Sequence, residues 1–528
     1  MQKNGLEFER VLFQSIVSDA SEDGCFVYLG TLLQRAAKHF FLDTALVEGL
    51  RKISYGELYF RALQLSRALK ARGLKPRDRV MMFCGNSVEF YIFYFAALQC
   101  GAILVPVNTF LGTCELTHII NDCQPKMVLC ASRLSSKITD VEVQSKCEAF
   151  PDLICEKAIE WDETVPEAYA NFPEFEVTTL SLDEVCLILY TSGTTGNPKG
   201  VMLSSKNILS NTVQVSARLK RLAGLKERFF AVLPLFHVFA QNACIWIPFL
   251  HGATVIVVPK IDRVAIREGL KSCPTIFLGF PALYGLLCLM RNANLDSIKL
   301  FVSGADALPD KIRAAFAMIY GRAIHSGYGL TEAAPAIAVS DGNPCERTES
   351  VGPLLCGVES QIRDVQGSLV ASGSVGTLWV RGDNVMLGYY KDKEHTDNVI
   401  RDGWLNTGDF ACLSSDGNIS ICGREKDLII HKGLNIYPQE IENVLLSHPL
   451  VFRVAVVGEK DDAHGQTPVA FVVLKDKTRK IGQALRRFCL DRLAAYKVPK
   501  KIRCVEDLPL GATGKVDKKQ LKYRQEAL

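Results

Sequence analysis

The sequence predicts an α/β protein in which a large N-terminal domain of α/β subdomains with parallel-rich sheets is followed by a small α+β domain. Three observations indicate this. A chain of 528 residues is too long for a single hydrophobic core. Between residues 54 and 130, short apolar runs alternate with helical patterns, as in parallel βαβ units. Near the C-terminus, an amphipathic helix starting at Pro438 precedes two apolar strands, at 454–457 and 469–474.

The alternation begins at Ser54-Tyr-Gly-Glu57, a capping box that predicts the start of a helix. Apolar residues then recur at helical spacing as far as Gly73. Further along, we expect strands at 80–84, 103–107 and 127–130, with a helix at about 87–99 and another before the third strand. The acidic, irregular residues 150–180 are expected to connect subdomains.

Composition and charge exclude several classes of protein. With 48% hydrophobic and 22% charged residues, the chain is typical of soluble globular proteins. Its net charge of +4 is too small to indicate a nucleic-acid partner. The charge is uneven, since residues 426–528 carry 20 Lys and Arg against 12 Asp and Glu. A basic run is usually a solvated surface, but the run from Lys475 to Arg503 would also suit an acidic partner or a phosphorylated cofactor.

The 18 cysteines form no CxxC pair and no zinc-type cluster with histidine, so we expect reduced thiols and a cytoplasmic protein. The N-terminus lacks the apolar core of a signal peptide. Residues 229–259 are uncharged, but prolines, His237 and Gly252 interrupt them. We therefore expect a buried core or an apolar ligand channel there rather than a membrane span. Peripheral contact with a membrane, for access to substrate, stays open.

The stretch from Tyr190 to Gly200, TSGTTGNPKG after the tyrosine, follows the apolar run Val185–Leu189, a predicted buried strand. Its Ser, Thr and Gly residues allow tight turns, close backbone approach and hydroxyl donors, and Lys199 adds a positive charge. These features suit a polyphosphate, although composition alone would also fit a flexible surface loop. It is not a Walker A loop, because Pro-Lys-Gly stands where Gly-Lys-Ser/Thr is required.

This string resembles the phosphate loop of the adenylate-forming superfamily, which includes acyl-CoA synthetases, firefly luciferase and the adenylation domains of peptide synthetases. The resemblance spans about residues 50–520 and implies that the chain binds ATP and Mg²⁺. By the same resemblance, Thr194 would also contact the metal. The loop residues that it assigns to ATP are Thr191, Ser192, Gly193, Thr194, Thr195, Gly196 and Lys199.

Two further motifs match the family's adenine and metal sites. Ser303-Gly-Ala-Asp306 resembles the loop beside the adenine, which assigns Gly304, Ala305 and Asp306 to the nucleotide. In His325-Ser-Gly-Tyr-Gly-Leu-Thr-Glu332, the resemblance gives Tyr328 and Gly329 to the adenine, Thr331 to the phosphate and Glu332 to Mg²⁺ and catalysis. These residue types suit the roles, because a purine stacks on a ring and Mg²⁺ favours a carboxylate with phosphate oxygens and water.

The C-terminal motifs complete the implied site. Asp409, in GWLNTGD, would bind the ribose hydroxyls, and Arg424, in GREKDLIIHKG, would support the same site. Lys426 falls at the family's hinge, which divides the chain into an N-terminal domain, 1–425, with the ATP and acyl pockets, and a mobile C-terminal domain, 426–528. In LPLGATGKVD, Lys515 matches the catalytic lysine.

The acid to be activated is expected to be fatty. Leu233–Ala240 matches the motif that lines the carboxylate end of the family's acyl pocket, which gives His237 a role there. The uncharged segment beside it suits a fatty tail, because each buried methylene stabilises binding by about 0.8 kcal/mol. Where some long-chain synthetases have a gating tryptophan, Gln241 is the nearest residue here.

The resemblance implies an AMP-forming acid–thiol ligase. A carboxylate attacks the α-phosphate of ATP to give acyl-adenylate and pyrophosphate, and a thiol then displaces AMP to form a thioester. CoA is the acceptor we expect, making the chain a fatty acyl-CoA synthetase. The phosphopantetheine of acyl carrier protein is the alternative acceptor. The basic run favours it, and the sequence Asn384–Tyr389 resembles that of acyl-acyl-carrier-protein synthetases. A luciferase-like oxygenase, or a binding protein without activity, are more remote alternatives.

We predict that Lys515→Ala abolishes adenylation but largely spares thioester formation from supplied acyl-adenylate. Negative charge accumulates on the α-phosphoryl oxygens only in the first step, and losing one preorganised donor typically costs about 2.7–4 kcal/mol. The two half-reactions would be assayed separately. Equal loss of both would contradict this role of Lys515.

Overall fold

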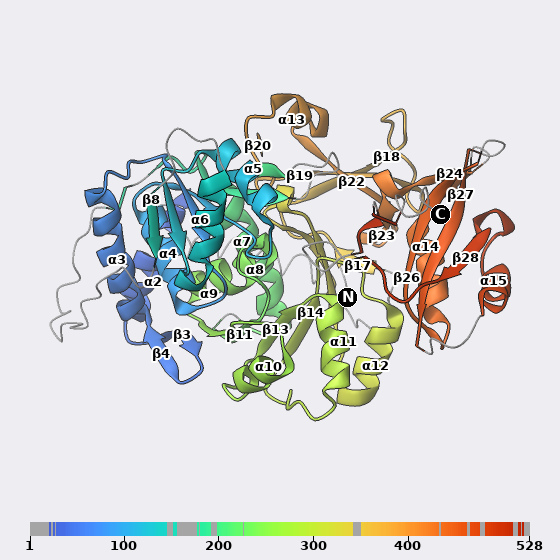
Figure 1. The fold of residues 1–528 in the computed structure, drawn as a ribbon, viewed down its shortest axis with the longest axis horizontal. Coiled ribbons are helices and arrows are strands. Elements are labelled where there is room, and N and C mark those ends of the chain that lie inside the picture. Colours follow the sequence, from blue (N-terminus) through green and yellow to red (C-terminus); the bar gives the residue numbers. More distant parts are fainter. Residues whose placement is uncertain are drawn as a thin grey trace.

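The computed structural model describes residues 21–22, 25–26, 28–144, 152–155, 177–178, 180–191, 198–224, 226–341, 350–431, 434–461, 465–475, 481–509, 516–518 and 520–521. Two large sheets with parallel centres form one part of the molecule, and an antiparallel sheet follows them along the chain (Figure 1). A smaller sheet with two helices lies at one end (Figure 1). The predicted fold class, large α/β followed by small α+β, is confirmed.

The first large sheet has seven strands, of which the central ones are parallel. Apolar side chains on both faces explain why helices cover it. The strands, in spatial order, are β20 (Gly388–Tyr389), β10 (Lys199–Ser204), β9 (Val185–Thr191), β6 (Ile103–Pro106), β5 (Arg79–Phe83), β7 (Met127–Cys130) and β8 (Asp152–Cys155). Its accompanying helices are α3 (Tyr55–Ala71), α4 (Val88–Gln99), α5 (Thr113–Cys123), α6 (Ser135–Gln144) and α7 (Ser205–Leu222).

The predicted strands and helices of this region agree with the structure to within a few residues. Ser54 begins α3, and its hydroxyl oxygen accepts a hydrogen bond from the Glu57 N–H at 3.1 Å. Ser87 caps α4 in the same way. Every residue of α4 except Glu89 is buried, which places this helix inside the core rather than on the surface.

The second large sheet has eight strands, parallel from β3 to β15. In spatial order these are β16 (Ala336–Val339), β15 (His325–Gly329), β14 (Leu300–Ser303), β13 (Ile276–Gly279), β11 (Arg228–Ala231), β12 (Thr254–Val257), β3 (Thr44–Glu48) and β4 (Arg51–Ser54). Its helices include α2 (Leu32–Phe40), α10 (Arg263–Leu270), α11 (Pro281–Leu289) and α12 (Asp310–Tyr320). The start of the His325 motif, which could be read as a loop, is itself strand β15.

The uncharged residues 229–259 run through β11, the short helix α8 (Val238–Gln241), the π-helical turn η4 (Asn242–Trp246), α9 (Ile247–His251) and β12. They pack as core. Trp246 is fully buried, and its indole N–H donates to the Tyr94 hydroxyl, which donates in turn to Gln241 Oε1 at 3.2 Å. Gln241 is therefore a core residue in this arrangement. Within the residues that the structure describes, no helix is both long enough and apolar enough to cross a membrane.

The third sheet is antiparallel and consists of β17 (Ser350–Pro353), β23 (Asn418–Arg424), β22 (Trp404–Leu413), β19 (Val375–Arg381) and β18 (Glu359–Arg363), with β21 (Ile400–Arg401) beside β22. Helix α13 (Lys393–Val399) precedes β21. The chain then passes through the turn η6 (Glu425–Asp427) into a different sheet. The predicted domain boundary between 425 and 426 lies in this turn. Whether the turn acts as a hinge between two moving domains stays a prediction.

The C-terminal sheet consists of β25 (Leu434–Ile436), β24 (Ile429–His431), β27 (Gly465–Leu474), β26 (Val451–Asp461) and β28 (Lys501–Cys504), packed with α14 (Pro438–Ser447) and α15 (Gly482–Leu490). Helix α12 of the second sheet reaches it (Figure 1). The Lys311 ammonium on α12 donates to the Val451 carbonyl oxygen at 2.9 Å and lies 3.5 Å from those of His448 and Pro449, just past the end of α14.

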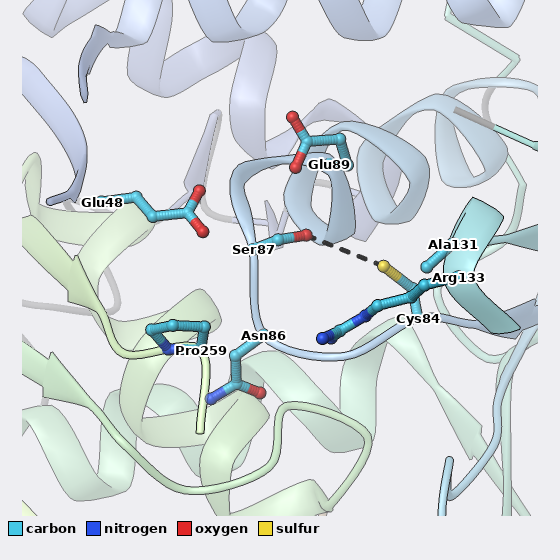
Figure 2. Close-up of a pocket in the computed structure, with 8 residues that line it drawn as sticks. All are labelled: Glu48, Cys84, Asn86, Ser87, Glu89, Ala131, Arg133 and Pro259. Atoms are coloured by element: carbon cyan, nitrogen blue, oxygen red, sulfur yellow. Dashed lines mark hydrogen bonds between the residues drawn. The ribbon is translucent and has the colours of Figure 1, made fainter. Parts of the chain in front are cut away.

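Asn86 joins the two large sheets. It lies between β5 and α4, beside a cavity of about 210 Å³ that Glu48, Ser87 and Arg133 also line (Figure 2). Its amide nitrogen, which carries two N–H donors, lies 2.9–3.2 Å from the carbonyl oxygens of Ala231, Leu233 and Val258, and its oxygen accepts from the Leu235 N–H at 2.9 Å. One buried side chain therefore contacts four backbone groups at or just beyond the ends of β11 and β12.

We predict that Asn86→Ala lowers the free energy of unfolding by about 3 kcal/mol, because buried backbone groups lose their partners. Urea unfolding followed by circular dichroism would measure the change. Asn294→Ala is the matched control, since Asn294 is exposed and its oxygen accepts from the nearby Asp296 N–H. An equal, small effect of both substitutions would contradict this role of Asn86.

Candidate active site

The predicted site residues come from several elements that lie next to one another. Thr191 ends β9 and pairs with Lys199 at the start of β10, so the two flank the predicted phosphate loop. Gly304, Ala305 and Asp306 follow β14, while Tyr328 and Gly329 end β15 and Thr331 and Glu332 begin the turn η5 (Thr331–Ala333). Ser192, Gly193, Thr194, Thr195, Gly196 and Lys515 lie outside the described residues, so their roles stay predictions.

A buried carboxylate, that of Asp409, links three of these elements. The Tyr328 hydroxyl donates to Asp409 Oδ2 at 2.6 Å, and Arg424 Nε donates to Asp409 Oδ1 at 2.8 Å. The register of β22 and β23 sets the second contact, because Asp409 and Arg424 are directly paired residues. The side chain of Asp409 is 3% exposed, so its charge needs compensation, to which these two partners contribute.

The electrostatics of this cluster keep Tyr328 protonated and Arg424 charged. Burial, and then the neighbouring Asp409 charge, raise the pKa of Tyr328 well above its usual value, so the phenol stays a donor. Burial alone would lower the pKa of Arg424, but Asp409 and Tyr328 raise it overall. A carboxylate oxygen can accept more than one hydrogen bond, and the ribose-binding role of Asp409 stays a prediction.

Glu332 has a partner that sequence reasoning missed. The Tyr389 hydroxyl donates to Glu332 Oε1 at 2.9 Å, and the Met386 N–H donates to the Glu332 carbonyl oxygen. Asn384 is fully buried and donates to the Ala333 carbonyl oxygen, which ties its segment to η5. Burial, and then the Glu332 charge, raise the pKa of Tyr389, so it too stays a donor.

Gly329 and Ala305 have backbone conformations that limit what can replace them. A Cβ at Gly329 would lie 2.0 Å from the Pro335 carbonyl oxygen, so only glycine fits this close approach. Ala305 adopts a left-handed φ of 67°. Both residues are at predicted nucleotide contacts.

His237 lies beside the predicted nucleotide site. It precedes α8, is half-buried, and its ring contacts that of Phe236, with 4.7 Å between centroids. Two residues on, the Phe239 ring packs against Gly304, where a Cβ would lie 3.2 Å from it. The His237 motif and the predicted adenine loop are therefore neighbours in space.

The C-terminal domain contributes charge to the same region. Lys426 is exposed in η6. Lys518, three residues after Lys515 in sequence, pairs with Glu442 at 2.8 Å and with Asp427 at 3.9 Å. Burial alone would lower the pKa of Lys518, but Glu442, Asp427 and Asp306 raise it overall. The charge of Asp306, in the predicted adenine loop, is thus one of those that act on Lys518.

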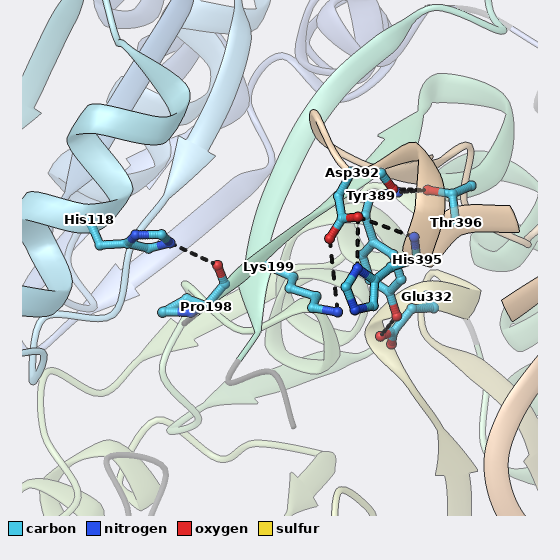
Figure 3. Close-up of polar contacts among 8 residues, drawn as sticks. All are labelled: His118, Pro198, Lys199, Glu332, Tyr389, Asp392, His395 and Thr396. Atoms are coloured by element: carbon cyan, nitrogen blue, oxygen red, sulfur yellow. Dashed lines mark hydrogen bonds and ion pairs between the residues drawn. The ribbon is translucent and has the colours of Figure 1, made fainter. Parts of the chain in front are cut away.

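Lys199 belongs to a polar network that also includes Glu332 (Figure 3). Its ammonium lies 3.9 Å from Asp392 Oδ2 and 5.5 Å from the centroid of the Tyr389 ring, whose hydroxyl bonds to Glu332. Asp392 also bonds to His395. The sequence signalled neither Tyr389 nor Asp392 as functional. Asp392-Lys-Glu-His could at most indicate the helix start that the structure shows there.

The residues around Glu332 suit a divalent cation held jointly with a polyphosphate. Among the described residues, no cluster of three or more His, Cys, Asp or Glu could hold a metal ion by itself. A single carboxylate with one oxygen bonded to Tyr389 agrees with the coordination preferred by Mg²⁺, which takes one or two carboxylates together with phosphate oxygens and water.

Comparison with known proteins agrees with this geometry. The model of the AMP-binding enzyme family matches residues 33–390, and that of the AMP-binding enzyme C-terminal domain matches residues 440–515. A feruloyl-CoA synthase of Amycolatopsis sp. is 33% identical over 94% of this chain and 99% of its own length. A long-chain-fatty-acid–CoA ligase of Bacillus subtilis is 32% identical over 93% and 94%.

A solved structure shares the whole fold. ATP-bound MatB from Rhodopseudomonas palustris superposes with a TM-score of 0.84 at 29% identity, covering 94% of this chain and 99% of that one. The likeness covers nearly all of both chains. The chain therefore belongs to the AMP-binding enzyme family of the adenylate-forming superfamily, and is an AMP-forming acid–thiol ligase.

Proposed function

We propose that the protein activates a fatty acid as acyl-AMP and transfers the acyl group to CoA. The contact between Phe239 and Gly304 carries this proposal. It sets the aromatic and apolar residues after His237 directly beside the predicted adenine loop, so that an apolar acid placed against them would have its carboxylate near the nucleotide. No charged residue occurs in 229–259 to meet a polar substituent on that acid.

The nucleotide would be held by the residues already described. Asp409 binds the ribose hydroxyls while Arg424 and Tyr328 hold its carboxylate, and the Tyr328 ring provides a face for adenine. Lys199 and the loop 191–196 bind the β- and γ-phosphates. Glu332 would hold Mg²⁺, which neutralises phosphate charge when bound. Tyr389 would orient the Glu332 carboxylate through its hydrogen bond.

In the first half-reaction the acid's carboxylate attacks the α-phosphorus and pyrophosphate leaves. His237 would position the carboxylate, and Lys515 would stabilise the charge that develops on the α-phosphoryl oxygens. In the second half-reaction the C-terminal domain pivots at Lys426, which removes Lys515 and admits the thiol. The acyl–phosphate bond then breaks as the thioester forms, and AMP leaves.

Acyl carrier protein is the second candidate acceptor, and the surface of α15 favours it. Arg486, Arg487 and Arg492 are exposed along or just after this helix. An acidic carrier protein would be attracted to such a surface at low ionic strength. Whichever acceptor it uses, we propose that the protein is cytoplasmic, since the described cysteines are free thiols.

We expect AMP release to depend on a fatty acid together with CoA. The measurement combines a saturated fatty-acid series, ferulic acid and malonic acid with CoA or with acyl carrier protein. Strong preference for ferulic or malonic acid would contradict the fatty-acid assignment. Preference for the carrier protein, with loss of activity as salt increases, would contradict CoA and support the basic surface of α15 as its docking site.

Tyr389→Phe should raise the Mg²⁺ concentration needed for half-maximal adenylation about ten-fold, because Glu332 loses the hydrogen bond that orients it. The ring beside Lys199 remains, so the KM for ATP at saturating Mg²⁺ should change little. Pyrophosphate exchange at varied Mg²⁺ measures both. Tyr390→Phe, at the next position along the chain, is the control. An unchanged Mg²⁺ requirement would show that Glu332 does not hold the metal.

A further inference from the structure

We infer that Asp392 is the resting counter-ion of Lys199, which it releases when a polyphosphate binds and takes back when pyrophosphate leaves. The inference rests on the proposed role of Lys199 in binding phosphate. Asp392 is not one of the motif residues of the nucleotide site. It caps the N-terminus of α13 and pairs with Lys199.

The position of Lys199 allows such an exchange. Its side chain is 16% exposed, extends from the start of β10 across the Tyr389 ring, and ends 3.9 Å from Asp392 Oδ2. That distance is an ion pair without a close hydrogen bond. The ammonium is thus held electrostatically, above the same ring whose hydroxyl bonds to Glu332, and it can turn toward a phosphate without breaking a strong directional bond.

The carboxylate, in contrast, is fixed. Asp392 caps α13, with Oδ1 accepting from the His395 N–H at 3.2 Å and bonding to the His395 ring Nδ1 at 2.8 Å (Figure 3). Thr396 also holds the backbone of Asp392 in place, since its hydroxyl donates to the Asp392 carbonyl oxygen and accepts from the Tyr389 N–H. When the ammonium moves, Asp392 stays behind, so the charge pair separates rather than moving as a unit.

The sign of the effect follows from the charges. An anion 3.9 Å from the ammonium competes with phosphate oxygens for the same positive charge. Removing it should strengthen the binding of a polyanion. Partial burial alone would raise the pKa of Asp392, but the bonds from His395 and the charge of Lys199 lower it overall, so the carboxylate remains ionised at neutral pH.

The substitution Asp392→Asn tests this cleanly, because asparagine caps a helix as well as aspartate does. The dissociation constant of MgATP would be measured by calorimetry without any acid substrate, and that of inorganic pyrophosphate likewise. Both should fall about two- to five-fold at low salt, within the range for a partly exposed ion pair, and less at high salt. Unchanged or weaker binding in Asp392→Asn would overturn the inference.

A matched control separates a local effect from a change in net charge. Asp397 lies on the same helix, is 61% exposed and pairs with Lys393 at 3.0 Å. Asp397→Asn removes an equal charge and should leave both dissociation constants unchanged. If it tightens binding as much as Asp392→Asn does, the pairing with Lys199 is not responsible and the inference fails.

A double-mutant cycle with Lys199→Met shows whether Asp392 acts through Lys199. Lys199→Met should weaken MgATP binding, and adding Asp392→Asn to it should have no further effect. If Lys199→Met binds MgATP normally, the proposed role of Lys199 is wrong. If Lys199→Met weakens binding but Asp392→Asn acts equally with or without Lys199, the role of Lys199 stands and the counter-ion inference is wrong.

Discussion

The site is organised around the buried charge of Asp409. Tyr328 comes from the second sheet, Asp409 and Arg424 from the third, and the chain leaves for the C-terminal domain immediately after Arg424. A buried carboxylate is costly unless it is paired and hydrogen-bonded, so these three side chains stabilise one another only in this relative position. The same carboxylate that joins the sheets is the one that we propose binds the ribose. If it does, nucleotide binding and the assembly of the sheets depend on one group.

Much of the fold could be predicted from the sequence, because local patterns determine it. The strand 127–130 and the start of α3 at Ser54 follow from apolar runs and capping residues that act over a few positions. The motif residues Tyr328, Asp409 and Arg424 were found through resemblance, and the structure places them in contact. Tyr389 and Asp392 were missed, since their partners, Glu332 and Lys199, are far away in the chain and the pairing leaves no local pattern.

The acid-binding side was harder to predict than the nucleotide side. Residues 229–259 were expected to be a core or an apolar channel, and they pack as core around Trp246 and Tyr94. Apolar contacts are non-directional, so similar residues can close around different acids or around one another. Polar contacts at the nucleotide require particular atoms at particular distances. This difference is in line with relatives at about a third identity whose names give different acids.

The contact that Lys311 makes with the C-terminal domain is expected to depend on pH. Its ammonium lies among carbonyl oxygens beyond the end of α14, and burial, together with the nearby Lys475, lowers its pKa to about 8 from 10.5. A rotation that returned Lys311 to solvent would restore its ordinary pKa and so bind a proton between those two values. Between those two values, the arrangement described here would hold that proton less tightly than the rotated form. A rise in pH through this range would therefore favour it over any rotated form that exposes Lys311.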